Sequence, residues 1–264
     1  MSGDKQRIPD TGNFMRQSFL VITLVLGIAP IVWGAGLGRD ISGVWVAIAA
    51  DPPGGLGPAM PALAPAGQAM VKEFEDAYGK DAPEPGAYCV PMGIFTAMMS
   101  LASYPIEIIQ QPHRITMLSE YDMQNRRIYM DGRGHPKDYP HTVMGHSIGH
   151  WDGDTLVVDT ALLSEWHHHQ WPHSDKTRIE ERIYLMRRAD VKVDLSSSFA
   201  SGMKSLDDKI LVDEITIDDP GTYTKTPKIT MYYDRVSDDN ILEYDCVTDI
   251  WLQALEAHKA KMKK

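Results

Sequence analysis

Residues 104–130 read YPIEIIQQPHRITMLSEYDMQNRRIYM, and this stretch decides the expected fold. Short runs rich in Ile, Met, Tyr and Thr alternate with turn-forming residues, which is the spacing of antiparallel strands and not of βαβ units. Runs of the same kind occur before and after it. The predicted strands are Asp40–Val46, Ile106–Ile109, Arg114–Tyr121, Arg126–Met130, Thr155–Thr160, Arg178–Met186, Lys209–Ile217, Lys228–Asp234 and Ile241–Val247.

A sheet with so many strands and no interleaved helices must protect its edges, either by closing into a barrel or by stacking two sheets. We expect a mainly β fold in which antiparallel strands close into one barrel. The turn-forming sequences Asp131-Gly132 and Asp152-Gly153-Asp154 predict hairpins beside the neighbouring strands.

Three other segments complete the expected organisation. Residues 52–100 form a loop-rich insertion, crowded with Pro, Gly and Ala at its start and containing a short helix over Lys72–Tyr78. A helix over Ile250–Lys263 has a basic end, which is typical of a solvated C-terminal helix. The chain thus divides into an N-terminal segment (1–38), a barrel domain (39–250) and a C-terminal basic helix or tail (251–264).

The N-terminal segment predicts export. No charged residue occurs between Arg16 and Arg39, residues 19–33 are mostly apolar, and Lys5 and Arg7 precede them. This pattern is that of a signal peptide, and the uncharged stretch is also just long enough for an uncleaved membrane anchor. Either way we expect the barrel outside the cytoplasm: periplasmic, secreted, or anchored to the inner membrane and facing outward.

Export bears on the two cysteines of the chain, Cys89 and Cys246. In an oxidising compartment, two cysteines this far apart in sequence more often form a disulfide than remain as thiols. We therefore expect a Cys89–Cys246 bond, which would join the segment before the sheet to the last predicted strand.

The charge balance excludes two classes of partner. The chain has 26 Lys and Arg against 36 Asp and Glu, which gives a formal net charge of −10 at pH 7. Proteins that bind nucleic acid or an anionic membrane surface need an excess of basic residues to neutralise phosphate. We therefore expect no nucleic-acid partner, and contact with a membrane only through the N-terminal segment if it is uncleaved.

One short motif resembles a known barrel family. The sequence Asp40-Ile-Ser-Gly-Val-Trp45 places a Gly-x-Trp at the start of the first predicted strand. It resembles the opening of lipocalin-like (calycin) barrels, in which the Trp plugs the closed end. This resemblance implies an antiparallel lipocalin-like β-barrel that encloses one small, mostly apolar or aromatic ligand.

Longer motifs carry a second resemblance, over residues 40–250. They include Asp131-Gly-Arg-Gly-His-Pro136, the run MGHSIGHWDGDTLVVDT at 144–160, and Pro172-His-Ser174. A sequence with these motifs resembles a large family of uncharacterised exported bacterial proteins, and the resemblance implies no particular reaction. The chain departs from the family pattern at 166–171, where His167, His168 and His169 stand in place of a Gly-rich loop.

Histidine is concentrated in one part of the chain, because eight of the ten histidines lie between residues 135 and 173. Three of them, His135, His146 and His173, fall within the family-like motifs, at loops or strand ends. Loops at one rim of a barrel converge on its mouth, so these side chains can meet there. We expect them to form a catalytic site in which imidazoles act as general acid and base.

Neighbouring residues complete the predicted site. Asp131 would orient the His135 imidazole and raise its basicity. Arg133 would hold a carboxylate or phenolate of the ligand. The predicted substrate-binding residues are Tyr129, Trp151 and Glu181.

The expected function is cofactor-independent acid–base chemistry on a small apolar or aromatic molecule, as in a lyase, dehydratase or isomerase. Two alternatives remain open. The protein can be a non-catalytic carrier of such a ligand, or a metal-dependent enzyme in which His135, His146 and His173 bind zinc or another transition metal. The spacing of these histidines does not favour a metal site, so we expect none.

Overall fold

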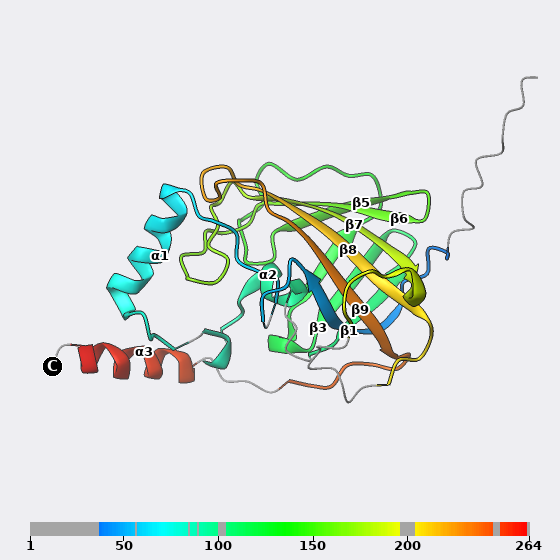
Figure 1. Cartoon of the computed structure of the whole chain (residues 1–264). Helices are drawn as coiled ribbons and strands as arrows, with labels where there is room; N and C mark the ends of the chain where they lie inside the picture. The colour runs from blue at the N-terminus through cyan, green and yellow to red at the C-terminus, as the bar shows by residue number, and fades with distance from the viewer. Residues whose placement is uncertain are drawn as a thin grey trace, which may run out of the picture. The chain divides into compact units, whose positions relative to one another are not determined.

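The computed structural model describes residues 37–55, 57–83, 85–88, 90–99, 104–195, 204–244 and 249–262. Nine strands close into a barrel in which neighbours in sequence are neighbours in the sheet (Figure 1). The strands are β1 (Gly43–Asp51), β2 (Ile106–Gln111), β3 (Arg114–Ser119), β4 (Asn125–Tyr129), β5 (His146–Asp152), β6 (Thr155–Ala161), β7 (Arg178–Arg187), β8 (Lys209–Asp218) and β9 (Lys228–Ser237). The mainly β fold and the closed barrel are therefore confirmed.

Three α-helices accompany the barrel in the described residues: α1 (Pro65–Tyr78), α2 (Gly93–Met99) and α3 (Asp249–Met262). Helix α1 is longer than expected because Pro65 starts it, and proline suits the first turn of a helix. Helix α2 was not predicted, since its short sequence GIFTAMM is apolar except for Thr96 and shows no amphipathic period. The C-terminal helix is confirmed. Short 3₁₀ turns occur at Pro85–Tyr88, Tyr121–Met123 and Arg188–Asp190.

The number of strands requires a departure from the expected antiparallel barrel. In a closed ring, strands alternate in direction throughout only if their number is even, so nine strands need at least one parallel pair. That pair is β4–β5, joined through Ile128–Ser147 and Tyr129–Ile148, whereas the other neighbouring strands are antiparallel. The barrel is mixed, and we call the β4–β5 junction the parallel seam.

The parallel seam overturns one turn prediction. Because β5 runs parallel to β4, the connection between them (residues 130–145) has to pass back along the barrel, so Asp131-Gly132 does not form a hairpin. Strand β5 itself was not among the predicted strands. The second turn is confirmed, since Asp152 pairs with Thr155 across Gly153-Asp154. Residues 241–244 are not in a strand, contrary to the prediction for Ile241–Val247, whose remainder lies outside the described residues.

Side chains fill the barrel interior. Alternate strand residues point inward, such as the fully buried Ile115 and Ile128, and α2 packs against the same core through Ile94 and Phe95. A cavity beside α2 has a volume of about 10 Å³, room for about one water molecule. Beside α2 the interior is therefore filled mainly by side chains.

One arginine is buried in this interior. Arg126 of β4 has five N–H donors, and all of them have acceptors. These are Ser147 Oγ at 3.0 Å, Thr160 Oγ1 at 2.7 Å, Met98 Sδ at 2.9 Å, and both carboxylate oxygens of Glu181. Because the partners lie on β5, β6, β7 and α2, the guanidinium ties together both sides of the parallel seam.

A second buried carboxyl group, on Asp213, joins this network. Burial raises the pKa of Asp213 well above its ordinary value, and the Glu181 carboxylate raises it further. The surroundings of Asp213 therefore favour its neutral, protonated form.

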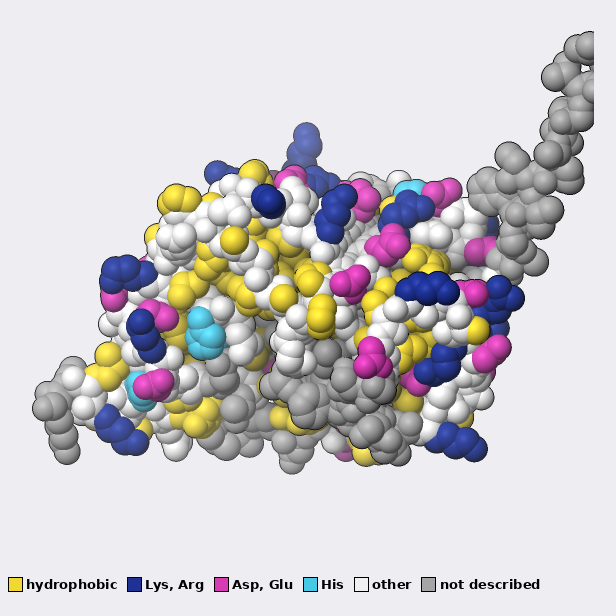
Figure 2. Space-filling view, viewed as in Figure 1, with side chains coloured by type: hydrophobic (Ala, Val, Ile, Leu, Met, Phe, Trp, Pro, Cys, Tyr) yellow, Lys and Arg dark blue, Asp and Glu magenta, His cyan; other side chains and the backbone are white. Residues whose placement is uncertain are grey.

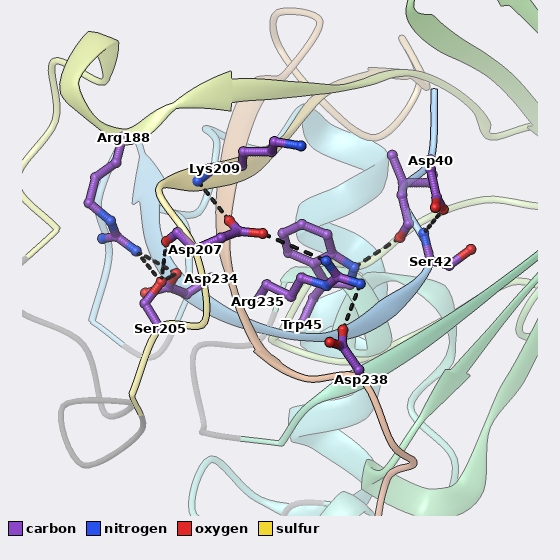
Figure 3. Close-up of polar contacts among 11 residues, drawn as sticks. Asp40, Ser42, Trp45, Arg188, Ser205, Asp207, Lys209, Asp234, Arg235 and Asp238 are labelled. Atoms are coloured by element: carbon purple, nitrogen blue, oxygen red, sulfur yellow. Dashed lines mark hydrogen bonds and ion pairs between the residues drawn. The ribbon is translucent and has the colours of Figure 1, made fainter. Parts of the chain in front are cut away.

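The Gly-x-Trp motif lies where β1 begins. Trp45 is buried in the core, and its indole N–H donates to the Ile41 carbonyl at 2.9 Å (Figure 3). Gly43 has a φ of +126°, and a Cβ there would lie 2.7 Å from Nε of Arg235. Glycine thus allows Arg235 to approach β1, and ion pairs with Asp207 and Asp238 hold that guanidinium (Figure 3).

Two predictions fall on other parts of the chain. The Cys89–Cys246 bond and the N-terminal segment up to residue 36 lie outside the described residues. Among the helices that the structure describes, none is long and apolar enough to span a membrane. On the face shown in Figure 2, basic side chains are interspersed with acidic ones and form no continuous basic surface.

Candidate functional site

Two of the three predicted catalytic histidines meet on the outer wall of the barrel. His146 is the first residue of β5, and the next residue, Ser147, points inward to Arg126. Alternation along the strand therefore turns His146 outward. His135, from the loop 130–145, lies against it with the two Nδ1 atoms 2.9 Å apart. We call these two hydrogen-bonded imidazoles the histidine pair.

A carboxylate lies next to the other nitrogen of His135. The Oδ2 atom of Asp159, on β6, is 3.5 Å from His135 Nε2, and Arg178 binds the same carboxylate. The negative charge favours the tautomer of His135 that carries its proton on Nε2. His135 Nδ1 is then an acceptor and His146 Nδ1 a donor, which leaves a lone pair on Nε2 of His146.

Gly145 determines where β5 starts. Its φ is +62°, and a Cβ at this position would lie 2.6 Å from the carbonyl oxygen of Ala161 on β6. We expect Gly145→Ala to displace His146, to break the histidine pair and to destabilise the fold by about 1–3 kcal/mol. Imidazole NMR spectra and urea denaturation check this. Gly134→Ala is the control, because a Cβ there meets nothing within 4 Å. Unchanged His146 signals in Gly145→Ala would contradict the expectation.

Aromatic rings surround His146. The Tyr129 ring stacks on it with centroids 5.1 Å apart and an interplanar angle of 20°, and Tyr139 meets its edge at 5.3 Å. The Arg133 guanidinium lies 4.1 Å from the centre of the Tyr129 ring and forms an ion pair with Asp131. The structure thus brings together the predicted residues His135, His146, Asp131, Arg133 and Tyr129.

A cavity of about 160 Å³ opens beside His146, at the parallel seam. Its lining is mainly polar and includes Asn125, Arg127, Tyr129, Tyr139, Thr142 and His146. Cavities that hold drug-sized ligands are larger, about 300–1,000 Å³. The site therefore suits a small polar molecule.

The surroundings of His146 favour its neutral form. Burial lowers the pKa of His146, and the nearby His135 and Arg133 lower it further. Hydrogen bonds from Arg133 lower the pKa of Asp131 to about 2, so this carboxylate is charged at neutral pH. The cavity thus has an uncharged imidazole base on its wall, with an ion pair beside it.

The third predicted histidine, His173, lies in a different environment. It is 4 % exposed, packs on Phe95 with centroids 4.6 Å apart, and forms a hydrogen bond between Nδ1 and the Trp171 carbonyl at 2.8 Å. Burial lowers its pKa to about 4. His173 does not line the cavity beside His146, so the three imidazoles do not converge on one pocket as expected.

The Pro172-His173-Ser174 motif instead joins two parts of the fold. The Asp219 carboxylate accepts hydrogen bonds from the Ser174 N–H at 2.8 Å and the Thr177 hydroxyl at 2.6 Å. The Tyr223 hydroxyl donates to the Pro172 carbonyl at 2.7 Å. These contacts fix the segment before β7 against the connection between β8 and β9.

Two of the predicted substrate-binding residues also lie away from the cavity. The Glu181 carboxylate is inside the barrel, where Arg126 binds it. Trp151 packs against the core, with the Arg39 guanidinium 5.7 Å from its ring. Of the three predicted residues, Tyr129 alone lines the cavity.

The histidine run at 167–169 is built into the fold. His167 contacts Glu73 of α1 at 3.0 Å and Glu165 at 3.3 Å, while His168 is buried with its ring 4.6 Å from that of Phe74. The run therefore attaches α1 to the segment before β7. In the described residues, no group of three or more His, Cys, Asp or Glu side chains is arranged to hold a metal ion.

Sequence reasoning missed Asp159, Arg127 and Tyr139. Asp159 and Arg127 occur in predicted strands, where alternation with buried neighbours places them on the outer face. This alternation indicates which face of the sheet a side chain lies on, but not which residue of the neighbouring strand it meets. Tyr139 lies in the 130–145 connection and has no periodic signal.

Comparison with known proteins identified no relative of this chain. No family model matches the chain, and neither the curated proteins nor the solved structures include a significant match. The functional argument therefore rests on the geometry of the site.

Proposed function

We propose that the protein is an exported enzyme that acts on a small molecule by cofactor-independent acid–base catalysis, as a lyase, dehydratase or isomerase. The observation that carries this proposal is the 2.9 Å contact between His135 and His146, with Asp159 on one side and a cavity on the other. The contact of a carboxylate with one imidazole, which in turn meets a second, is similar to the carboxylate–histidine arrangements that orient a general base.

In this proposal His146 is the base. Its Nε2 lone pair takes a proton from a carbon of the substrate, while the proton on its Nδ1 passes to Nδ1 of His135. His135 then carries the positive charge, which the Asp159 carboxylate stabilises. The reverse transfer returns a proton to a second carbon in an isomerase, or to a leaving oxygen in a lyase or dehydratase.

Other observations favour an enzyme over a carrier. A carrier of an apolar ligand needs an apolar chamber, whereas the described cavity beside His146 is polar and lies on the outer wall. The resemblance to exported bacterial proteins and the N-terminal segment support a periplasmic or secreted location, or an anchored one facing outward. The Gly-x-Trp motif supports a relation to calycin barrels, although the strand number and the parallel seam differ from an antiparallel barrel.

Solvent deuterium exchange tests the proposal without a known substrate. Small carbonyl compounds such as acetone, cyclohexanone and levulinate are incubated with the protein in D₂O, and the loss of α-proton NMR signals is followed. We expect the wild type to accelerate exchange of at least one compound and His146→Gln to lose about a hundredfold of that rate, as is typical when a general base is removed.

His150→Gln is the matched control, because His150 lies on the same strand, is exposed and does not line the cavity. It should exchange at the wild-type rate. Asp159→Asn should slow the exchange. Asp152→Asn is its control, because it also removes the carboxylate partner of an arginine on the outer wall, and it should leave the exchange rate unchanged. Equal rates in wild type and His146→Gln would contradict the proposal.

A further inference from the structure

The charges around the cavity indicate the class of its ligand. Among the arginines in the described part of the chain, Arg127 alone has neither an ion pair nor a side-chain hydrogen bond. Arg127 is exposed on β4, two residues before Tyr129, so both side chains lie on the outer face about 7 Å apart. Arg127 lines the same cavity as His146.

This arginine gives the cavity an uncompensated positive charge. None of the lining residues, all of them described, is Asp or Glu. The neighbouring guanidiniums are already neutralised, Arg126 by Glu181 and Arg133 by Asp131. The chain as a whole has a net charge of −10, so an unpaired cation at this position is not a consequence of a basic composition.

We propose that Arg127 binds a carboxylate of the substrate, and that the enzyme acts on a small monocarboxylic acid. This inference rests on the proposed function of the histidine pair. The planar guanidinium matches the two oxygens of a carboxylate, and its single charge matches a monoanion. Asn125, Tyr139 and Thr142 line the same space and supply hydrogen-bonding groups.

The placement of these groups also gives the substrate a direction. A carboxylate bound by Arg127 leaves the remainder of a small acid in a cavity whose wall includes His146 and the stacked Tyr129 ring. The end of the molecule remote from the carboxylate is then free to meet the base. Charge recognition and proton transfer are thus divided between β4 and β5, on the two sides of the parallel seam.

NMR titrations with propionate, its neutral amide propionamide and inorganic phosphate test the inference. We expect propionate to shift the signals of His146 and Tyr139 and to bind more tightly than the other two probes. Arg127→Gln should weaken propionate binding by about tenfold or more, and Arg127→Lys, which keeps the charge but not the planar fork, should weaken it less. Arg182→Gln, at a half-buried arginine of the β7 outer wall paired with Asp152, should bind propionate as the wild type does.

The inference is overturned if the wild type does not bind propionate, if propionamide or phosphate binds as tightly, or if Arg127→Gln binds propionate unchanged. His146→Gln separates this result from the proposed function, because it should still bind propionate while losing deuterium exchange. Exchange of acetone without propionate binding would overturn the carboxylate assignment and leave the histidine pair as the base. Propionate binding that depends on Arg127, without exchange of any compound, would support the assignment and contradict the acid–base mechanism.

Discussion

Replacing Arg126 with methionine is expected to lower the free energy of unfolding by about 3–5 kcal/mol, because it leaves the Glu181 carboxylate buried and unpaired. The loss includes all five hydrogen bonds of the guanidinium, several of which cross the parallel seam. Urea denaturation followed by tryptophan fluorescence measures it, with the midpoint falling and the slope unchanged.

The double variant Arg126→Met, Glu181→Leu is the control for this prediction. Replacing both partners of a buried ion pair with apolar groups is often close to neutral, so the double variant should recover much of the stability lost in Arg126→Met. Burial favours the neutral form of the neighbouring Asp213 in both variants. A double variant less stable than the single one would show that the guanidinium acts through packing and not through its charge.

Lowering the pH is expected to destabilise the wild type through His173. The unfolded chain binds a proton at this histidine below about pH 6.5, whereas in the folded protein burial lowers the pKa to about 4. The contribution of His173 to the free energy of unfolding is therefore fully present above pH 6.5 and is lost as the pH falls to 4. The total loss is on the order of 3 kcal/mol. Urea denaturation at a series of pH values between 7 and 4 measures this loss.

The variant His173→Phe isolates the contribution of this residue. Phenylalanine fills similar space against Phe95 and cannot be protonated, so the stability of the variant should fall less than that of the wild type over the same pH range. His113→Phe, at an exposed histidine in the turn after β2, should retain the wild-type pH dependence. An equal pH dependence in His173→Phe and wild type would show that His173 does not titrate as a buried group. We also expect His173→Ala to lower the free energy of unfolding, because the buried imidazole packs on Phe95.

Much of the fold could be predicted from short apolar runs and turns. The runs at 106–109, 114–121 and 178–186 fall on β2, β3 and β7, because alternation of buried and exposed residues is a local property. Strand β5 was missed since its sequence, His-Ser-Ile-Gly-His-Trp-Asp, has few β-branched residues and a central glycine. Its place in the sheet depends on partners in β6, which a single sequence does not reveal.

The site was predictable only in part, for a related reason. Motifs identified His135 and His146, and the structure brings them into contact. The same motif argument selected His173, which is a packing residue. A motif does not show whether a residue serves packing or chemistry. Glu181 was expected to bind a ligand, but its carboxylate pairs with Arg126 instead. The two residues are 55 positions apart in sequence, so a single sequence gives no signal of this pairing.

Nine is an odd number, and the position of the histidine pair follows from it. A barrel of eight or ten strands can be antiparallel throughout, and its chain then passes from each strand to the next by a turn at the rim. Such a barrel would not need a connection like residues 130–145, which passes back along the wall. In this protein that connection brings His135 and Tyr139 to His146. With one strand more or one fewer, the number of parallel pairs in the closed ring would have to be even, so a single seam of this kind would not occur. The strand number of the barrel and the place of the histidine pair on its wall are therefore linked by the topology of the sheet.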